Sequence, residues 1–135
     1  MDLSDALIKR GSIFHSCEFE HIDHCKFFII IGENKDNYAG YFFINSNINR
    51  NISKKPEYFN MQAPIKKSNY SFLNYNSYID CHAISLIPKD KLSRQIKNER
   101  TTFIGFLLDD DIELLLENLR NSDLYSENEK NSFFR

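Results

Sequence analysis

The most informative stretch of the sequence for the fold is Asn76-Ser77-Tyr78-Ile79-Asp80-Cys81-His82-Ala83-Ile84-Ser85-Leu86-Ile87-Pro88-Lys89-Asp90-Lys91-Leu92. Between positions 78 and 83, polar residues alternate with apolar or small ones. A period of two is typical of a half-buried β-strand. Pro88 lacks a backbone donor, so it ends the strand or begins a helical turn. The apolar side of this strand needs partners elsewhere in the chain.

Hydrophobic segments earlier and later in the sequence supply these partners. Residues 27–31 form a continuous apolar run, which is typical of a central strand buried on both faces. A polar turn at 32–37 separates this run from a third predicted strand at 38–44, so the two are expected to form a hairpin. Residues 12–19 and 100–107 predict a first and a last strand.

Helices are predicted after the central stretch. Residues 89–96 predict a short helix, and a longer amphipathic helix follows the last strand. Its apolar stripe has the spacing i, i+3, i+4, i+7 and consists of Ile112, Leu115, Leu116 and Leu119. Asp109, Asp110 and Asp111 offer N-caps and complement the helix dipole. The tail at 126–135 is predicted to be flexible.

The order of these segments favours a mainly β protein. Five to seven short, mostly antiparallel strands with a C-terminal helix and short helical insertions predict a small curled barrel. Strands and helices do not alternate along the chain, which argues against a layered α/β sheet. The length of 135 residues is that of one domain, placed at residues 1–125.

Charge is unevenly distributed although the net charge is only −2. Residues 46–67 contain five basic residues against one acidic residue, and residues 109–129 contain eight acidic residues against one arginine. The whole chain therefore has no field that would attract nucleic acid. The basic segment is either a polyanion site or, equally well, a solvated surface.

The cysteines and the N-terminus bear on location and metal binding. Three cysteines, at 17, 25 and 81, do not form a disulfide framework, so a reduced, cytoplasmic protein is expected. The first five residues are acidic and do not resemble a signal peptide, and no stretch reaches the roughly 20 apolar residues of a membrane span. No Cys-x-x-Cys pair is present, so neither a metal site nor a cofactor is expected.

Four segments together resemble the MazF/PemK family of toxin endoribonucleases. They are Lys9-Arg10-Gly11-Ser12-Ile13-Phe14, Cys25-Lys26-Phe27-Phe28-Ile29-Ile30-Ile31, the stretch from Tyr78 to Leu92, and Gly105-Phe106-Leu107-Leu108-Asp109-Asp110-Asp111-Ile112. The resemblance covers residues 9–122 and implies an SH3-like barrel. It also implies a cytoplasmic homodimer that cleaves single-stranded RNA without metal and is neutralised by an antitoxin protein.

The sequence departs from the family where the chemistry is located. The family enters its second strand with Arg-Pro, whereas this chain has Lys26 and Phe27. Lysine is a point charge and does not bind a phosphate in the forked manner of arginine. Ser46 is the nearest match to the hydroxyl residue that ends the family's third strand, and Ser12 replaces an acidic residue after Gly11. The fold is therefore expected to be retained while the catalysis is altered.

Metal-independent RNA cleavage needs a base for the 2′-hydroxyl, a cation or donor for the phosphate, and an acid for the leaving oxygen. The polar segment at 18–26 supplies candidates for these roles. We assign Lys26 to the phosphate charge, His24 to acid/base work and Ser46 to a phosphate hydrogen bond. The alternative is a polar loop with an exposed histidine.

RNA binding is assigned to the predicted surface loop at 46–60, which combines basic and aromatic residues. The expected substrate-binding residues are Asn47, Arg50, Lys54, Lys55 and Tyr58. The alternative is a mobile loop with its aromatic residues packed on the barrel. Asp80 and His82, two residues apart on one strand face, are either an orienting pair or part of a solvated face.

Two functions follow from the sequence. The first is a MazF/PemK-like endoribonuclease. The alternative is an SH3-like barrel that has lost catalysis and serves as a binding module for RNA or protein.

Overall fold

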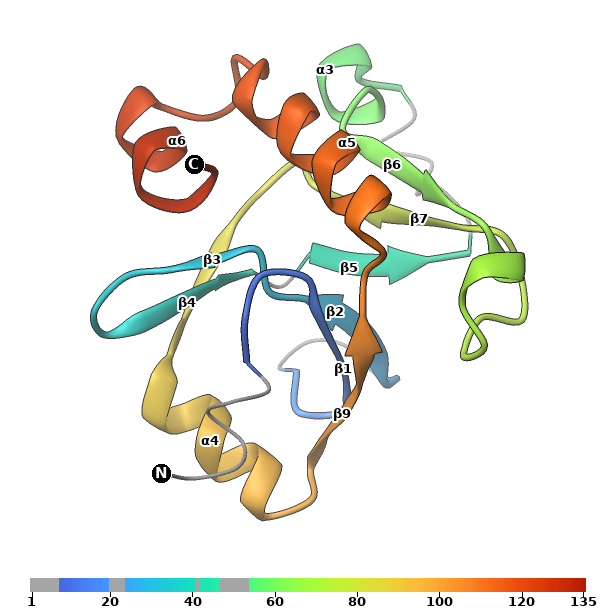
Figure 1. Ribbon diagram of the computed structural model, residues 1–135, viewed down its shortest axis with the longest axis vertical. Coiled ribbons are helices and arrows are strands. Elements are labelled where there is room, and N and C mark those ends of the chain that lie inside the picture. Colours follow the sequence, from blue (N-terminus) through green and yellow to red (C-terminus); the bar gives the residue numbers. More distant parts are fainter. Residues whose placement is uncertain (1–7, 20–23, 41, 47–53) are drawn as a thin grey trace.

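The computed structural model describes residues 8–19, 24–40, 42–46 and 54–135. In these residues the strands form two antiparallel sheets (Figure 1). The larger sheet has the order β6 (Gln62–Ile65), β7 (Ser77–Asp80), β5 (Phe42–Asn45), β2 (Lys26–Ile29), β1 (Ser12–Ser16) and β9 (Thr101–Phe106). The smaller sheet has the order β3 (Gly32–Glu33), β4 (Asn37–Gly40) and β8 (Ser85–Pro88). The predicted mainly β, antiparallel fold class is confirmed.

The stretch at 76–92 passes from one sheet to the other. β7 lies between β6 and β5 in the larger sheet, and β8 pairs with β4 in the smaller sheet. The alternation predicted one strand through residue 83, and this is wrong, because the strand ends at Asp80. Cys81 instead donates its N–H to Met61 O (2.9 Å) and accepts from the Tyr125 hydroxyl (2.6 Å). Pro88 ends β8 and is the N-cap of α4 (Lys89–Lys97).

The predicted third strand at 38–44 is also divided between the sheets, since β4 and β5 belong to different ones. The division comes after Gly40. A Cβ at this position would lie 2.6 Å from Ile29 O, so the close crossing of the two chain segments requires glycine. The predicted hairpin is present in two parts, because β2 pairs with β5 and β3 pairs with β4.

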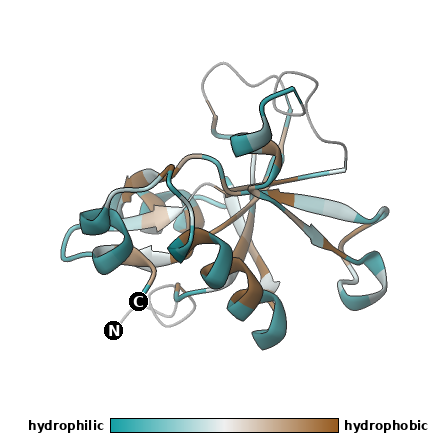
Figure 2. Cartoon of the chain, turned by 90° about the horizontal axis from the view of Figure 1, so that it is seen from above, coloured by the Kyte–Doolittle hydropathy of each residue, from teal (hydrophilic) through white to brown (hydrophobic). Residues whose placement is uncertain are grey.

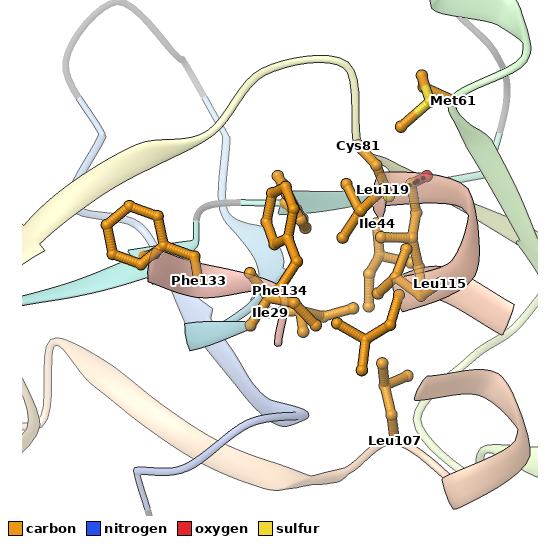
Figure 3. Packing of buried hydrophobic residues seen from close by; sticks show 14 of the residues in the cluster. Ile29, Ile44, Met61, Cys81, Leu107, Leu115, Leu119, Phe133 and Phe134 are labelled. Atoms are coloured by element: carbon orange, nitrogen blue, oxygen red, sulfur yellow. Dashed lines mark hydrogen bonds between the residues drawn. The ribbon is translucent and has the colours of Figure 1, made fainter. Parts of the chain in front are cut away.

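Two hydrophobic clusters cover opposite faces of the larger sheet, because successive side chains of β1 and β2 alternate between them. The first cluster lies beneath α5 (Asp109–Arg120) and contains three residues of the predicted stripe, Leu115, Leu116 and Leu119, all buried. Figure 3 shows Leu115 and Leu119 among them. The second cluster contains Phe14 and Phe28 and packs against Leu92 of α4. Figure 2 shows that the helical ribbons alternate between hydrophilic and hydrophobic segments.

The first turn of α5 is capped differently from the prediction. Its N-cap is Leu108, and none of the three aspartates occupies that position. The Leu108 N–H donates to the Tyr70 hydroxyl (3.0 Å), and this hydroxyl in turn donates to the Asp111 carboxylate. Tyr70 is far away in the sequence, near the 3-10 helix η1 (Lys67–Asn69), so a local capping rule could not identify it.

The C-terminal residues form a helix, α6 (Glu127–Phe133), where the sequence predicted a flexible tail. Ser126 and Glu129 form a capping box at its start. Phe133 and Phe134 are buried in the first cluster (Figure 3). The Arg10 guanidinium donates to Phe133 O (2.9 Å) and Arg135 O (3.0 Å). The two phenylalanines thus anchor a segment whose polar composition alone indicated disorder.

The remaining differences concern the two segments around the candidate site. The predicted loop at 46–60 contains a short helix, α3 (Pro56–Phe59), and residues 47–53 lie outside the described ranges. The expectation of reduced cysteines is wrong for Cys17 and Cys25, which are linked by a disulfide, whereas Cys81 is a buried free thiol. Among the described helices, none has the length and apolar character needed to cross a bilayer.

Candidate active site

Lys26 is the first residue of β2 and is partly buried. Its Nζ donates to Asn45 Oδ1 at 2.6 Å and lies 5.8 Å from the centroid of the Phe43 ring. Burial lowers the pKa of Lys26, and the negative charge of Asp80 partly opposes this by raising it. The ammonium is therefore held in a defined position and has lost part of its hydration.

Strand register places further polar residues on the same face of the sheet as Lys26. β2 pairs with β5, β5 with β7, and β7 with β6, and paired residues project to the same side. Phe27, Ile44 and Ile79 point into the first cluster, so their neighbours along each strand point the other way. We call this other side the open face, and it consists of Lys26, Asn45, Gln62, Tyr78 and Asp80, all partly exposed.

Asp80 and His82 form a hydrogen-bonded pair at the edge of the open face. The His82 ring binds Asp80 Oδ1 through Nδ1. The same oxygen accepts from Gln62 Nε2 (2.8 Å) and from the backbone N–H of His82 (3.3 Å). The side chain of Asp80 is 16% exposed and that of His82 is 30% exposed. The carboxylate is thus fixed by three donors, while the ring retains access to solvent.

Helix α3 covers this pair from one side. The Tyr58 ring lies 5.0 Å from the His82 ring at an interplanar angle of 47°. Lys55, the N-cap of α3, places its Nζ 5.1 Å from the centroid of the Tyr58 ring. The predicted substrate-binding residues Lys55 and Tyr58 therefore lie against His82. Lys54 is exposed and precedes α3.

The other predicted site residues are distributed more widely. His24 is exposed, two residues before Lys26 and next to the disulfide-bonded Cys25. Ser46 follows β5 and lines a pocket of about 190 Å³ with Phe27 and Phe72. Since Phe27 points away from the open face, this pocket lies on the other side of the sheet from Lys26. Asn47 and Arg50 lie outside the described residues.

Two residues of the site were not predicted from the sequence as functional. Asn45, one position before the predicted Ser46, is the residue that contacts Lys26. The parity of β5 could have identified it, because Asn45 follows apolar Ile44 and shares a face with Phe43. Gln62 anchors Asp80 from β6, and only the strand pairing brings it there.

The described residues contain no cluster of three or more His, Cys, Asp or Glu side chains suited to a metal ion. The arrangement provides one cation, one imidazole paired with a carboxylate, and two amide side chains on β5 and β6, the strands on either side of β7. Such a set can bind an anionic group and transfer a proton near it.

The two antiparallel sheets and the helix after β9 together form a MazF-like fold, as a comparison with solved structures shows. The solved structure of the Mycobacterium tuberculosis toxin MazF-mt6 has this fold, with a TM-score of 0.52 over 83% of this chain and 94% of that chain. The two sequences are 17% identical, so the similarity concerns the fold. No family model matches the sequence, and no curated protein matches it.

Proposed function

We propose that this protein is an endoribonuclease that cleaves single-stranded RNA without a metal ion, as a toxin of the MazF kind. The observation that carries the proposal is the convergence of the Lys26 ammonium and the Asp80–His82 pair on the open face of a MazF-like sheet. RNA cleavage develops negative charge on the phosphate, and a fixed, partly desolvated cation stabilises that charge.

In this proposal, Lys26 binds the non-bridging oxygens of the scissile phosphate. Asn45 positions the ammonium through its 2.6 Å hydrogen bond. His24, two residues before Lys26 in the sequence, takes part in acid/base catalysis, and Ser46 donates a hydrogen bond to a phosphate oxygen. Ser46 lines the pocket on the other side of the sheet, so it can reach the same RNA strand only where the RNA passes the C-terminal end of β5.

The RNA strand is proposed to run along α3 and the residues before it. Tyr58 offers an aromatic face for a base, and Lys54 and Lys55 offer charges for the phosphates. Asn47 and Arg50 complete the proposed binding set. A homodimer, an antitoxin partner that covers the RNA-binding surface, and a cytoplasmic location are further parts of the proposal.

The test is cleavage of labelled single-stranded RNA by purified protein in the presence of EDTA. We expect fragments that end in a 2′,3′-cyclic phosphate, and a rate at least about 100-fold lower for Lys26→Ala. Lys54→Ala is the matched control, because it removes an exposed lysine near the same surface and is expected to weaken binding only. If the wild-type protein cleaves none of the tested RNA sequences, the proposal is refuted.

A second candidate function is a binding module without catalysis. The observation in its favour is that a lysine, already hydrogen-bonded to Asn45, stands at the position where the MazF/PemK family has an arginine. Retained RNA binding that weakens steeply with salt, without any cleavage, would favour this function. Induced expression separates the two in cells, since only the endoribonuclease is expected to fragment mRNA and slow growth.

A further inference from the structure

His82 has one ring nitrogen engaged and one directed away from its partner. Nδ1 is bound to Asp80 Oδ1, and an ionised carboxylate only accepts hydrogen bonds, so the proton of this bond belongs to Nδ1. The tautomer is thereby fixed, and Nε2 is the nitrogen that remains for proton transfer. The same division of roles between the ring nitrogens occurs wherever a carboxylate orients a catalytic histidine.

The carboxylate that orients the ring is itself anchored. Gln62 Nε2 donates to Asp80 Oδ1 at 2.8 Å and also contacts Tyr58 O at 3.4 Å, so one amide ties β6, β7 and α3 together. The His82 backbone N–H adds a third donor to the same oxygen. A local turn would need only this backbone bond. The ring contact and the Gln62 contact exceed what a turn requires, and both restrict where the imidazole points.

The surroundings of the ring suit a group that works beside a phosphate. The Tyr58 ring lies 5.0 Å from the imidazole and limits its rotation. Burial lowers the pKa of Lys26, and the negative charge of Asp80, on the same face of the sheet, partly offsets this effect. Asp80 therefore acts electrostatically on the phosphate-binding cation and contacts the imidazole directly. When the ring is protonated it is ion-paired with Asp80, which is the state from which a general acid acts.

We infer that His82 is a catalytic residue that donates a proton from Nε2 to the 5′-oxygen leaving group of the RNA, and that Asp80 is its positioning residue. This inference rests on the proposed endoribonuclease function. In the reaction, the 2′-oxygen forms a bond to phosphorus and its proton passes to a base, for which His24 is the proposed group. The bond between phosphorus and the 5′-oxygen breaks, and that oxygen receives the His82 proton. The products are a 2′,3′-cyclic phosphate and a 5′-hydroxyl, and His82 is left neutral.

The test compares two substrates in single-turnover cleavage. One is an RNA oligonucleotide containing a site that the wild-type protein cuts, and the other carries a sulfur in place of the 5′-oxygen at that site. A thiolate is a far better leaving group than an alkoxide and departs without protonation. We expect His82→Gln to lower the rate on the oxygen substrate about 100-fold, and to lower the rate on the sulfur substrate less than about 10-fold.

The controls keep the result interpretable. The ratio of the two rates is measured on one protein sample, so it does not depend on how much of a variant is folded. Asp80→Asn is expected to show the same preference for sulfur with a smaller loss, because the ring remains but is oriented less well. His15→Gln, which alters a histidine packed on Phe27 and not on the open face, is expected to show no preference.

Equal losses on both substrates for His82→Gln, or wild-type rates on both, would overturn the inference while leaving the proposed function intact. A wild-type protein that cuts neither substrate would overturn both. Cleavage that requires Lys26 but is indifferent to His82 would retain the endoribonuclease and assign the leaving-group proton to another residue.

Discussion

The side of the larger sheet that carries Lys26 has two halves, and they differ although the same strands build them. On β2, Phe28 is fully buried, while Lys26, two residues earlier on the same side, is partly exposed and charged. On β5, Phe43 contacts the aromatic cluster, while Asn45 holds the ammonium. We call the first half, which consists of Phe14, Phe28 and Phe43, the covered half. In the same strands, the residues at one end thus stabilise the fold, and those at the other end form the candidate site.

The covered half is expected to show the largest effect on stability. Phe28 is 0% exposed, and its ring stacks on Phe14 at 5.6 Å and meets Phe19 edge-on at 5.7 Å. Phe28→Ala would leave a cavity in the second cluster, so the free energy of unfolding should fall by about 3–5 kcal/mol. Urea denaturation measures this change. Tyr78→Ala on the open face is the control, with an expected loss of about 1 kcal/mol; equal losses would erase the distinction between the halves.

In contrast to Phe28→Ala, Lys26→Met is expected to lower the cleavage rate strongly and the stability only slightly. The cleavage rate should fall about 100-fold because the cation at the phosphate is lost, while the unfolding free energy changes by less than about 1 kcal/mol. Stability is spared because burial already disfavours the charged lysine, as its lowered pKa indicates, and methionine retains an unbranched stem of similar shape. Single-turnover cleavage and urea denaturation are measured on the same protein. A large loss of stability would instead make Lys26 a structural residue.

The Lys26→Arg variant tests whether the cation on the open face binds a phosphate. A guanidinium can bind a phosphate through two parallel hydrogen bonds, which an ammonium cannot do. If the open face is a phosphate site, this variant should retain at least the wild-type cleavage rate. A loss as deep as that of Lys26→Met would mean that the 2.6 Å contact with Asn45, and not the charge alone, determines activity.

The disulfide lies at the Lys26 end of β2, where it joins the residue after β1 to the residue before Lys26. It closes a loop with a sequence separation of 8. A loop of this size restricts the unfolded chain enough to contribute about 2–3 kcal/mol. Dithiothreitol should therefore lower the urea midpoint of the wild-type protein but leave that of the Cys17→Ser/Cys25→Ser variant unchanged. Two free thiols at these positions in the untreated protein would contradict the pairing.

The sequence predicted the apolar elements of the fold better than the open face. The continuous apolar run at 27–31 predicted β2, which the structure has at Lys26–Ile29, and the helical spacing predicted the stripe of α5, because burial of apolar area follows from local pattern. The bend after Asp80 and the split at Gly40 were not predicted, since both depend on contacts between segments far apart in the sequence. The helical tail was missed for the same reason, as Phe133 and Phe134 are anchored by a core formed mainly by earlier segments.

The open face depends on register, and a shift of one residue changes which side chain faces the site. The sequence therefore pointed to Ser46, whereas Asn45 is the residue in contact with Lys26. The pairing of Asp80 with His82 was visible as an i, i+2 spacing, but the third participant, Gln62, enters only through the pairing of β6 with β7. The local sequence thus indicated which types of residue form the site, but not which of them contact one another.

The smallest effect is expected on the other side of the sheet, where Tyr70 and Tyr125 belong to the first cluster. Burial is the main cause that raises the pKa of both hydroxyls, and burial also raises the pKa of the Cys81 thiol. In the unfolded chain each tyrosine loses its proton near pH 10, but in the folded chain it retains the proton to higher pH. The folded state then binds more protons than the unfolded state, so stability falls as pH rises above about 10.

Tyr125→Phe tests this dependence, because it removes one titrating group and leaves the ring in place. Near pH 7 the variant should lose about 1–2 kcal/mol, since Cys81 O no longer receives the 2.6 Å hydrogen bond. Above pH 10 the deficit should shrink by up to about 1.4 kcal/mol per pH unit relative to wild type. Urea denaturation from pH 7 to 11 measures both. A deficit that stays constant with pH would show that the buried hydroxyl is not linked to alkaline unfolding, and would leave Tyr70 and Cys81 as the groups that respond.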